Sequence, residues 1–118
     1  MVEDDRSLRD LMGLVLEDEG FTVSRAANTS DAFRAIEAAR PDVMMIDVNL
    51  SGEDGAALCR AVKSRPETAS IKCMMWSSAP DLGAIARSVG ADAWLVKPTD
   101  LDVLVRRIED LADGGGRR

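Results

Sequence analysis

Short apolar runs alternate with longer amphipathic stretches along this chain of 118 residues. The short runs predict buried strands, because the strands of a parallel sheet that is covered on both faces are apolar throughout. The predicted strands are residues 1–2, 21–26, 43–46, 73–76 and 93–96. The first of these is unusually short, since only Met1 and Val2 precede the acidic residues that begin at Glu3.

The longer stretches repeat their apolar residues with the period of a helix, as Leu8, Met12 and Leu16 do in the first of them. The predicted helices are residues 7–19, 30–39, 55–64, 82–89 and 101–112. Glycine accepts the left-handed backbone that often ends a helix, and polar side chains commonly cap the start. We therefore expect Gly20 and Gly90 to follow helix ends, Thr29 or Ser30 to cap the second helix, and Thr99 or Asp100 to cap the last.

The predicted order is a strand followed by a helix, repeated five times, which indicates an α/β fold with a parallel sheet between two layers of helices. In open sheets of this kind, binding sites form beyond the carboxyl ends of the strands. That rule brings four polar groups to one edge. They are the acids Glu3, Asp4 and Asp5, then Asp47, then Ser77 with Ser78, and finally Lys97.

Composition narrows the class of protein. The chain is 46% hydrophobic and 31% charged, as expected for one globular domain, and no apolar run approaches the roughly 20 residues that span a bilayer. Its net charge of −6 argues against direct nucleic-acid binding through a basic patch. The start of the chain does not resemble a signal peptide, so we expect a cytoplasmic protein without membrane insertion.

Two cysteines, Cys59 and Cys73, lie among apolar residues, and the chain has no histidine. A zinc site is therefore disfavoured, and two reduced thiols packed in the core are expected. The absence of histidine also excludes catalysis by histidine and a role as a phosphohistidine donor.

A carboxylate at the end of a buried strand is costly unless its charge is used. Asp47 closes such a run, and further acids, a hydroxyl and one ammonium are predicted to meet it. Carboxylates are the ligands that Mg²⁺ takes in phosphoryl-transfer sites. The residues by themselves therefore predict a Mg²⁺-assisted phosphoryl acceptor.

Four short motifs, in this order, resemble the receiver domain of two-component response regulators. They are residues 2–5, residues 47–50 with Gly55 behind them, residues 76–78, and residues 97–98. The resemblance implies a flavodoxin-like, doubly wound (βα)5 fold with a five-stranded parallel sheet in the order 2-1-3-4-5. It also implies a receiver domain over residues 1–112, which leaves residues 113–118 as a flexible tail.

The resemblance assigns roles to the acidic residues. Asp47 is similar to the phosphoacceptor, whose carboxylate attacks phosphorus to form an aspartyl phosphate. Asp4 is similar to the direct Mg²⁺ ligand, Glu3 to the acid that acts through a metal-bound water, and Asp5 to a neighbour that is not a ligand. Asn49 would offer its backbone carbonyl to the metal.

The resemblance also implies a switch. Lys97 would pair with the phosphoryl oxygens, and before phosphorylation with Asp47. Ser77 occupies the position of the switch hydroxyl and Trp94 that of the switch aromatic residue. The Lys97–Pro98 peptide bond would be cis.

Phosphorylation would come from a sensor histidine kinase or phosphotransfer protein, and the chain would catalyse its own phosphorylation and dephosphorylation. The surface of the fourth helix, fifth strand and fifth helix would then bind a downstream protein target or a second copy in a homodimer.

The chain departs from the family pattern at Ser51, where proline is common, at Thr99, where phenylalanine is common, and at Ala79. These departures and the short first strand keep a second hypothesis open, a receiver-like interaction module that does not depend on phosphorylation. A haloacid-dehalogenase-like phosphatase is disfavoured, because Asn49 stands where such enzymes need an acid.

Each site residue also has a purely structural alternative. Asp47, Ser77 and Ser78 could simply end strands or form turns. The acids that start at Glu3 could favour a helix N-terminus, since the helix dipole attracts negative charge there. Lys97 could be a solvated lysine, and Trp94 could pack only against the last helix.

Overall fold

The computed structural model describes residues 1–113. Its five helices are α1 (Arg6–Asp18), α2 (Thr29–Ala38), α3 (Gly55–Ser64), α4 (Leu82–Val89) and α5 (Leu101–Ala112). The main sheet is parallel, with β1 (Val43–Asp47), β4 (Lys72–Ser77) and β5 (Ala93–Val96) side by side in that order. A short antiparallel pair, β2 (Asn49–Leu50) and β3 (Glu53–Asp54), forms the loop between β1 and α3.

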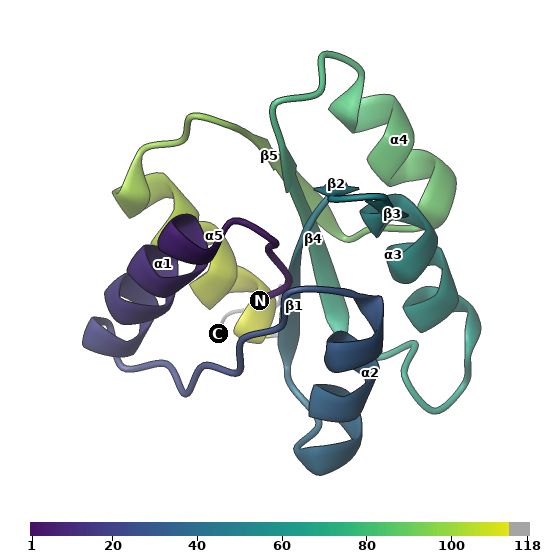
Figure 1. The fold of residues 1–118 in the computed structure, drawn as a ribbon, viewed down its shortest axis with the longest axis horizontal. Coiled ribbons are helices and arrows are strands. Elements are labelled where there is room, and N and C mark those ends of the chain that lie inside the picture. The colour runs from purple at the N-terminus through teal and green to yellow at the C-terminus, as the bar shows by residue number, and fades with distance from the viewer. Residues whose placement is uncertain (114–118) are drawn as a thin grey trace.

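Helices cover both faces of the sheet, with α1 and α5 on one side and α2, α3 and α4 on the other (Figure 1). The alternation of side chains along the strands explains this arrangement, because successive residues point to opposite faces. Met74 and Trp76 of β4 belong to the core beneath α1 and α5, whereas Cys73 and Met75 belong to the core beneath α3 and α4. The predicted three-layer α/β architecture is confirmed.

The first two predicted strands do not form as strands. Instead, Val2 makes isolated parallel bridges to Ala26 on one side and to Ile46 on the other. Within residues 1–113, the pairing at Val2 consists of a few hydrogen bonds, such as the one from the Val2 N–H to the Met45 carbonyl at 2.8 Å. The five-stranded sheet in the order 2-1-3-4-5 is therefore not what the structure shows: its parallel sheet has three strands, with Val2 bridged beside it.

The short pairing leaves a cavity of about 430 Å³ at the opposite end of the sheet from Asp47. Met1, Phe21 and Val43 are among its lining residues. The short first strand therefore leaves unfilled space at the end of the sheet far from Asp47. At the end near Asp47, the hydrogen bonds of Val2 hold the neighbouring acids in register with β1. The Asp47 N–H donates to the Val2 carbonyl at 3.0 Å.

Helix boundaries agree with the predictions to within one residue, and three of them match at both ends. Gly90 ends α4 in the left-handed conformation, with φ of +80°, as expected, and Asp100 caps α5. The predicted cap of α2 was wrong. Asn28 takes that role, because its side-chain oxygen accepts a hydrogen bond from the Asp31 N–H at 2.8 Å.

Cys59 and Cys73 are free thiols, and both are fully buried, as predicted. Within residues 1–113, no helix is long and apolar enough to cross a membrane. The flexible tail predicted for residues 113–118 lies, beyond Asp113, outside the described residues.

Candidate phosphoryl-acceptor site

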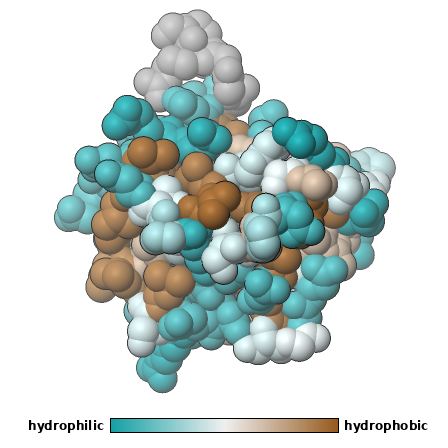
Figure 2. All heavy atoms as spheres, turned by 90° about the horizontal axis from the view of Figure 1, so that it is seen from above, coloured by the Kyte–Doolittle hydropathy of each residue, from teal (hydrophilic) through white to brown (hydrophobic). Residues whose placement is uncertain are grey.

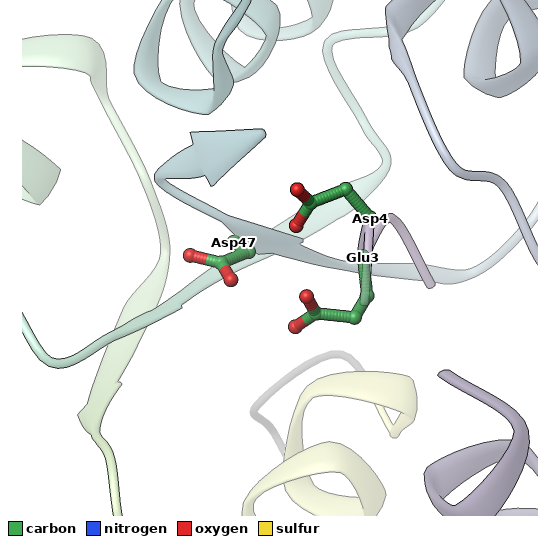
Figure 3. Close-up of side chains that lie close together, drawn as sticks. All are labelled: Glu3, Asp4 and Asp47. Atoms are coloured by element: carbon green, nitrogen blue, oxygen red, sulfur yellow. The ribbon is translucent and has the colours of Figure 1, made fainter. Parts of the chain in front are cut away.

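The three acids predicted to form the site lie together. Asp47 is the last residue of β1, and the Val2 bridge places Glu3 and Asp4 next to it. Glu3, Asp4 and Asp47 each offer one carboxylate oxygen, and these oxygens lie within 4.8 Å of one another. The carboxylates of Glu3 and Asp4 extend from adjoining backbone toward the side on which the carboxylate of Asp47 lies (Figure 3). Such a cluster of hard oxygen donors has the chemistry of a Mg²⁺ site.

Asp5 has a different role from its two acidic neighbours. Its carboxylate accepts a hydrogen bond from the Leu8 N–H at 3.1 Å and so caps α1. The structural alternative considered for the acidic run therefore applies to Asp5, while Glu3 and Asp4 belong to the carboxylate cluster.

Lys97 supplies the positive charge of the site. It follows β5, and its ammonium donates to the Asp47 carboxylate at 2.8 Å and to the Glu3 carboxylate at 3.1 Å. Burial lowers the pKa of Lys97, but the hydrogen bonds and charges of Asp47 and Glu3 outweigh it, so that the pKa lies above its ordinary value. The Lys97–Pro98 peptide bond is cis, as predicted.

The two N-terminal acids have opposite electrostatic environments. Burial raises the pKa of Glu3, which is only 1% exposed, against the lowering effects of the Asp5 N–H and Lys97. A hydrogen bond from the Ser51 hydroxyl lowers the pKa of Asp4. The surroundings of Asp4 thus favour its charged form, whereas burial disfavours the charged form of Glu3.

The residues after β1 are organised around Asp47. Its carboxylate accepts a hydrogen bond from the Asn49 N–H at 3.0 Å, which fixes the start of the loop. The role predicted for the Asn49 carbonyl stays a prediction. The sequence marks Ser51 only as a departure from the common proline, and the hydrogen bond that its hydroxyl donates to Asp4 was not predicted. A serine two residues beyond Asn49 carries no sequence signal for that contact, because 47 residues separate Ser51 from Asp4.

Ser77 ends β4 at the same edge of the sheet. Its side chain is buried, and its hydroxyl accepts a hydrogen bond from the Ala79 N–H at 3.1 Å. Its carbonyl accepts from the Lys97 N–H at 2.9 Å, which couples the ends of β4 and β5. Ser78, in contrast, is exposed. The structure therefore brings Ser77, but not the Ser78 side chain, into the buried part of this edge.

Trp94 lies on β5 and packs toward α4 rather than toward the last helix. Its ring is partly buried, and the guanidinium of Arg87 lies 4.9 Å from the ring centroid. Gly83 of α4 also lies against it, since a Cβ at Gly83 would be 3.2 Å from the indole nitrogen. The structural alternative of packing against the last helix is therefore wrong.

A family model described as "Response regulator receiver domain" matches residues 1–109. The chain belongs to the response regulator receiver family. Among curated relatives, it is 34% identical over 122 residues to the transcriptional regulatory protein CseB of Streptomyces coelicolor. The aligned region covers 99% of this chain and 52% of the relative. It is 31% identical to the DNA-binding transcriptional regulator NtrC of Escherichia coli, with 92% of this chain and 23% of the relative covered. The chain thus spans about half or less of these relatives.

Solved structures show the same similarity in three dimensions. A putative response regulator from Chloroflexus aurantiacus superposes with a TM-score of 0.86 at 33% identity, covering 94% of this chain and 93% of the other. The chemotaxis protein CheY4 of Vibrio cholerae gives a TM-score of 0.84 at 28% identity, with 93% of each chain covered. These matches agree with the family assignment and with the flavodoxin-like class of fold.

Proposed function

We propose that this chain is a phosphorylation-controlled receiver in which Asp47 accepts a phosphoryl group with the help of Mg²⁺. The observation that carries the proposal is the convergence of Glu3, Asp4, Asp47 and Lys97 at one edge of the sheet. These residues fit a magnesium ion, because two or three carboxylate oxygens suffice for a cation that keeps several waters. Glu3, Asp4 and Asp47 would hold it, with the Asn49 carbonyl as a further ligand.

The carboxylate of Asp47 is the nucleophile. One of its oxygens attacks phosphorus, an O–P bond forms, and the N–P bond to the donor's phosphohistidine breaks with its electron pair going to the imidazole. Held by Glu3, Asp4 and Asp47, Mg²⁺ would supply the positive charge that offsets the repulsion between the phosphoryl oxygens and the carboxylates. Lys97, which already pairs with Asp47, moves its N–H groups onto those oxygens, and Ser77 adds a hydroxyl.

The donor we assign is a sensor histidine kinase or a phosphotransfer protein, because receiver domains interact with histidine kinases. Residues 1–118 contain no histidine, so the phosphohistidine lies outside them. The output surface runs over α4, β5 and α5. Three large apolar side chains are exposed there, Val96 at 54%, Leu101 at 44% and Val103 at 41%. Brown apolar side chains interrupt the polar surface in the view from above (Figure 2). Such exposed apolar groups favour a protein partner over direct contact with nucleic acid.

The test is to incubate the protein with Mg²⁺ and a small phosphodonor such as acetyl phosphate, and then to weigh the intact chain. We expect wild type to gain one phosphoryl group and Asp47→Asn to gain none. Asp81→Asn is the matched control, since Asp81 is exposed and makes no capping hydrogen bond, and it should be labelled like wild type. Equal labelling of wild type and Asp47→Asn would exclude Asp47 as the acceptor.

The second candidate is an interaction module that does not depend on phosphorylation. The observation that favours it is the reduction of the first strand to the bridges at Val2, since Glu3 and Asp4 depend on them. Wild type that is not labelled in the test above, but that binds a partner as tightly as Asp47→Asn does, would support this candidate.

A further inference from the structure

Lys97 has a third neighbour besides its two carboxylate partners. Its ammonium lies 4.3 Å from the centroid of the Trp76 ring. The side chain of Lys97 is only 21% exposed, so this contact is partly shielded from water. A cation at this distance over an indole face is attracted by the negative face of the ring, and the attraction strengthens when water is excluded.

Trp76 is well placed to act on Asp47 as well. The two residues are partners in the register of β1 and β4, so their side chains leave the sheet on the same face. Trp76 is 5% exposed and is packed in the core beneath α1 and α5, with Met12 and Leu104 in the same cluster. The ring is therefore a rigid support beneath the site rather than a mobile cover.

Core filling alone does not account for an indole here. The Trp76 indole N–H is buried and has no hydrogen-bond partner among the described residues. A buried donor without a partner is unfavourable, and a phenylalanine or leucine would fill apolar space without it. The contact that an indole improves is the one with Lys97, because the indole face attracts cations more strongly than the face of a phenyl ring does.

We propose that Trp76 is a positioning residue for phosphoryl transfer. Its ring holds the Lys97 ammonium beside Asp47 while the N–H groups of that ammonium change partners. The inference rests on the proposed function of Asp47. A ring face attracts a cation without binding any particular N–H. The ammonium can therefore turn its donors from the Asp47 carboxylate to the incoming phosphoryl oxygens without leaving its place.

The first experiment compares phosphorylation rates. With saturating Mg²⁺ and acetyl phosphate, we expect Trp76→Leu to lower the rate constant about tenfold, and Trp76→Phe to keep it within about threefold of wild type, because a phenyl face retains part of the attraction. The Phe variant breaks no hydrogen bond, since the indole N–H has no partner within residues 1–113. A Leu variant that melts like wild type and is phosphorylated at the same rate would overturn the inference, as would equal losses in both variants.

The second experiment needs no phosphorylation and detects the contact itself. In a Trp94→Phe background, Trp76 is the only tryptophan, and Lys97→Met should change its emission intensity or maximum. Lys72→Met is the matched control, because Lys72 lies at the opposite end of β4, and it should leave the emission unchanged. Identical spectra for Lys97→Met and its parent would overturn the inference even if Trp76→Leu failed to fold.

The two results separate the two proposals. Wild type that is never labelled, with an emission change in Lys97→Met, would contradict the role of Asp47 and with it the catalytic part of the inference. Normal labelling of wild type with no effect of either Trp76 variant would contradict only the role of Trp76.

Discussion

Gly55 packs directly against the backbone of Asp47. A Cβ at position 55 would lie 1.9 Å from the Asp47 carbonyl oxygen and 2.8 Å from its carbonyl carbon. The Gly55 N–H also donates to the Val48 carbonyl at 2.8 Å, so α3 starts against the strand end that carries the acceptor. The missing side chain at Gly55 is what lets α3 and the site approach so closely.

Gly55→Ala should therefore damage both stability and phosphorylation. The added methyl group meets backbone rather than a flexible side chain, and such overpacking costs about 1–3 kcal/mol of unfolding free energy. Denaturant unfolding and the labelling assay measure the two effects. Gly20→Ala is the control, because Gly20 has φ of +98° with no atom near its added Cβ. It should lose roughly 1–2 kcal/mol to backbone strain but be phosphorylated normally. Normal phosphorylation of Gly55→Ala would contradict the proposed importance of this contact.

Removing the charge of Glu3 should weaken Mg²⁺ binding. Partners that act through a metal-bound water contribute about 10- to 100-fold to metal affinity, so we expect Glu3→Gln to lose at least about tenfold. Isothermal titration measures the affinity, as does the emission of Trp76 in a Trp94→Phe background. Asp5→Asn is the matched control, since asparagine can still cap α1 and Asp5 lies outside the carboxylate cluster. An equal loss of Mg²⁺ affinity in the two variants would show that the net negative charge of this region matters and that Glu3 has no specific role.

Arg87→Ala should free the Trp94 ring. The guanidinium over this ring contributes about 0.5–1 kcal/mol at an exposed position, which favours the observed placement against α4. In a Trp76→Phe background, acrylamide should quench Trp94 more strongly once Arg87 is removed. Arg34→Ala, which removes an exposed arginine that pairs with Asp31, should leave the quenching unchanged. Unchanged quenching in Arg87→Ala would show that the contact does not hold the ring.

The two thiols should be inert in the folded protein. Cys59 and Cys73 are both 0% exposed, so a reagent in solution cannot reach either sulfur. The contact between the thiols raises the pKa of Cys73 but lowers that of Cys59, so the expected inertness rests on burial. Ellman's reagent should therefore react only as fast as the core opens, and with both thiols together in denaturant. Ser78→Cys places a third thiol at an exposed position and should react at once. Rapid native reaction without that substitution would show that the core between α3 and β4 opens locally.

Residues close together in sequence were predicted best. The helix ends at Gly90 and Asp100 depend on the conformational freedom of glycine and on a local capping hydrogen bond, so a few neighbouring residues suffice. The cap of α2 was missed by one residue, because Asn28, Thr29 and Ser30 are all competent caps. Only the backbone geometry selects among them.

The amino-acid sequence by itself determined the layered α/β architecture and the acids, hydroxyl and lysine at the ends of its strands, because apolar periodicity and strand direction are local properties. The tertiary structure decided which strands formed and which contacts completed the site. Val2 became a bridge instead of a strand, Ser51 reached Asp4, and Trp76 came to lie beneath Lys97. These contacts join residues from separate elements, so their energies exist only after the sheet and its helices have packed.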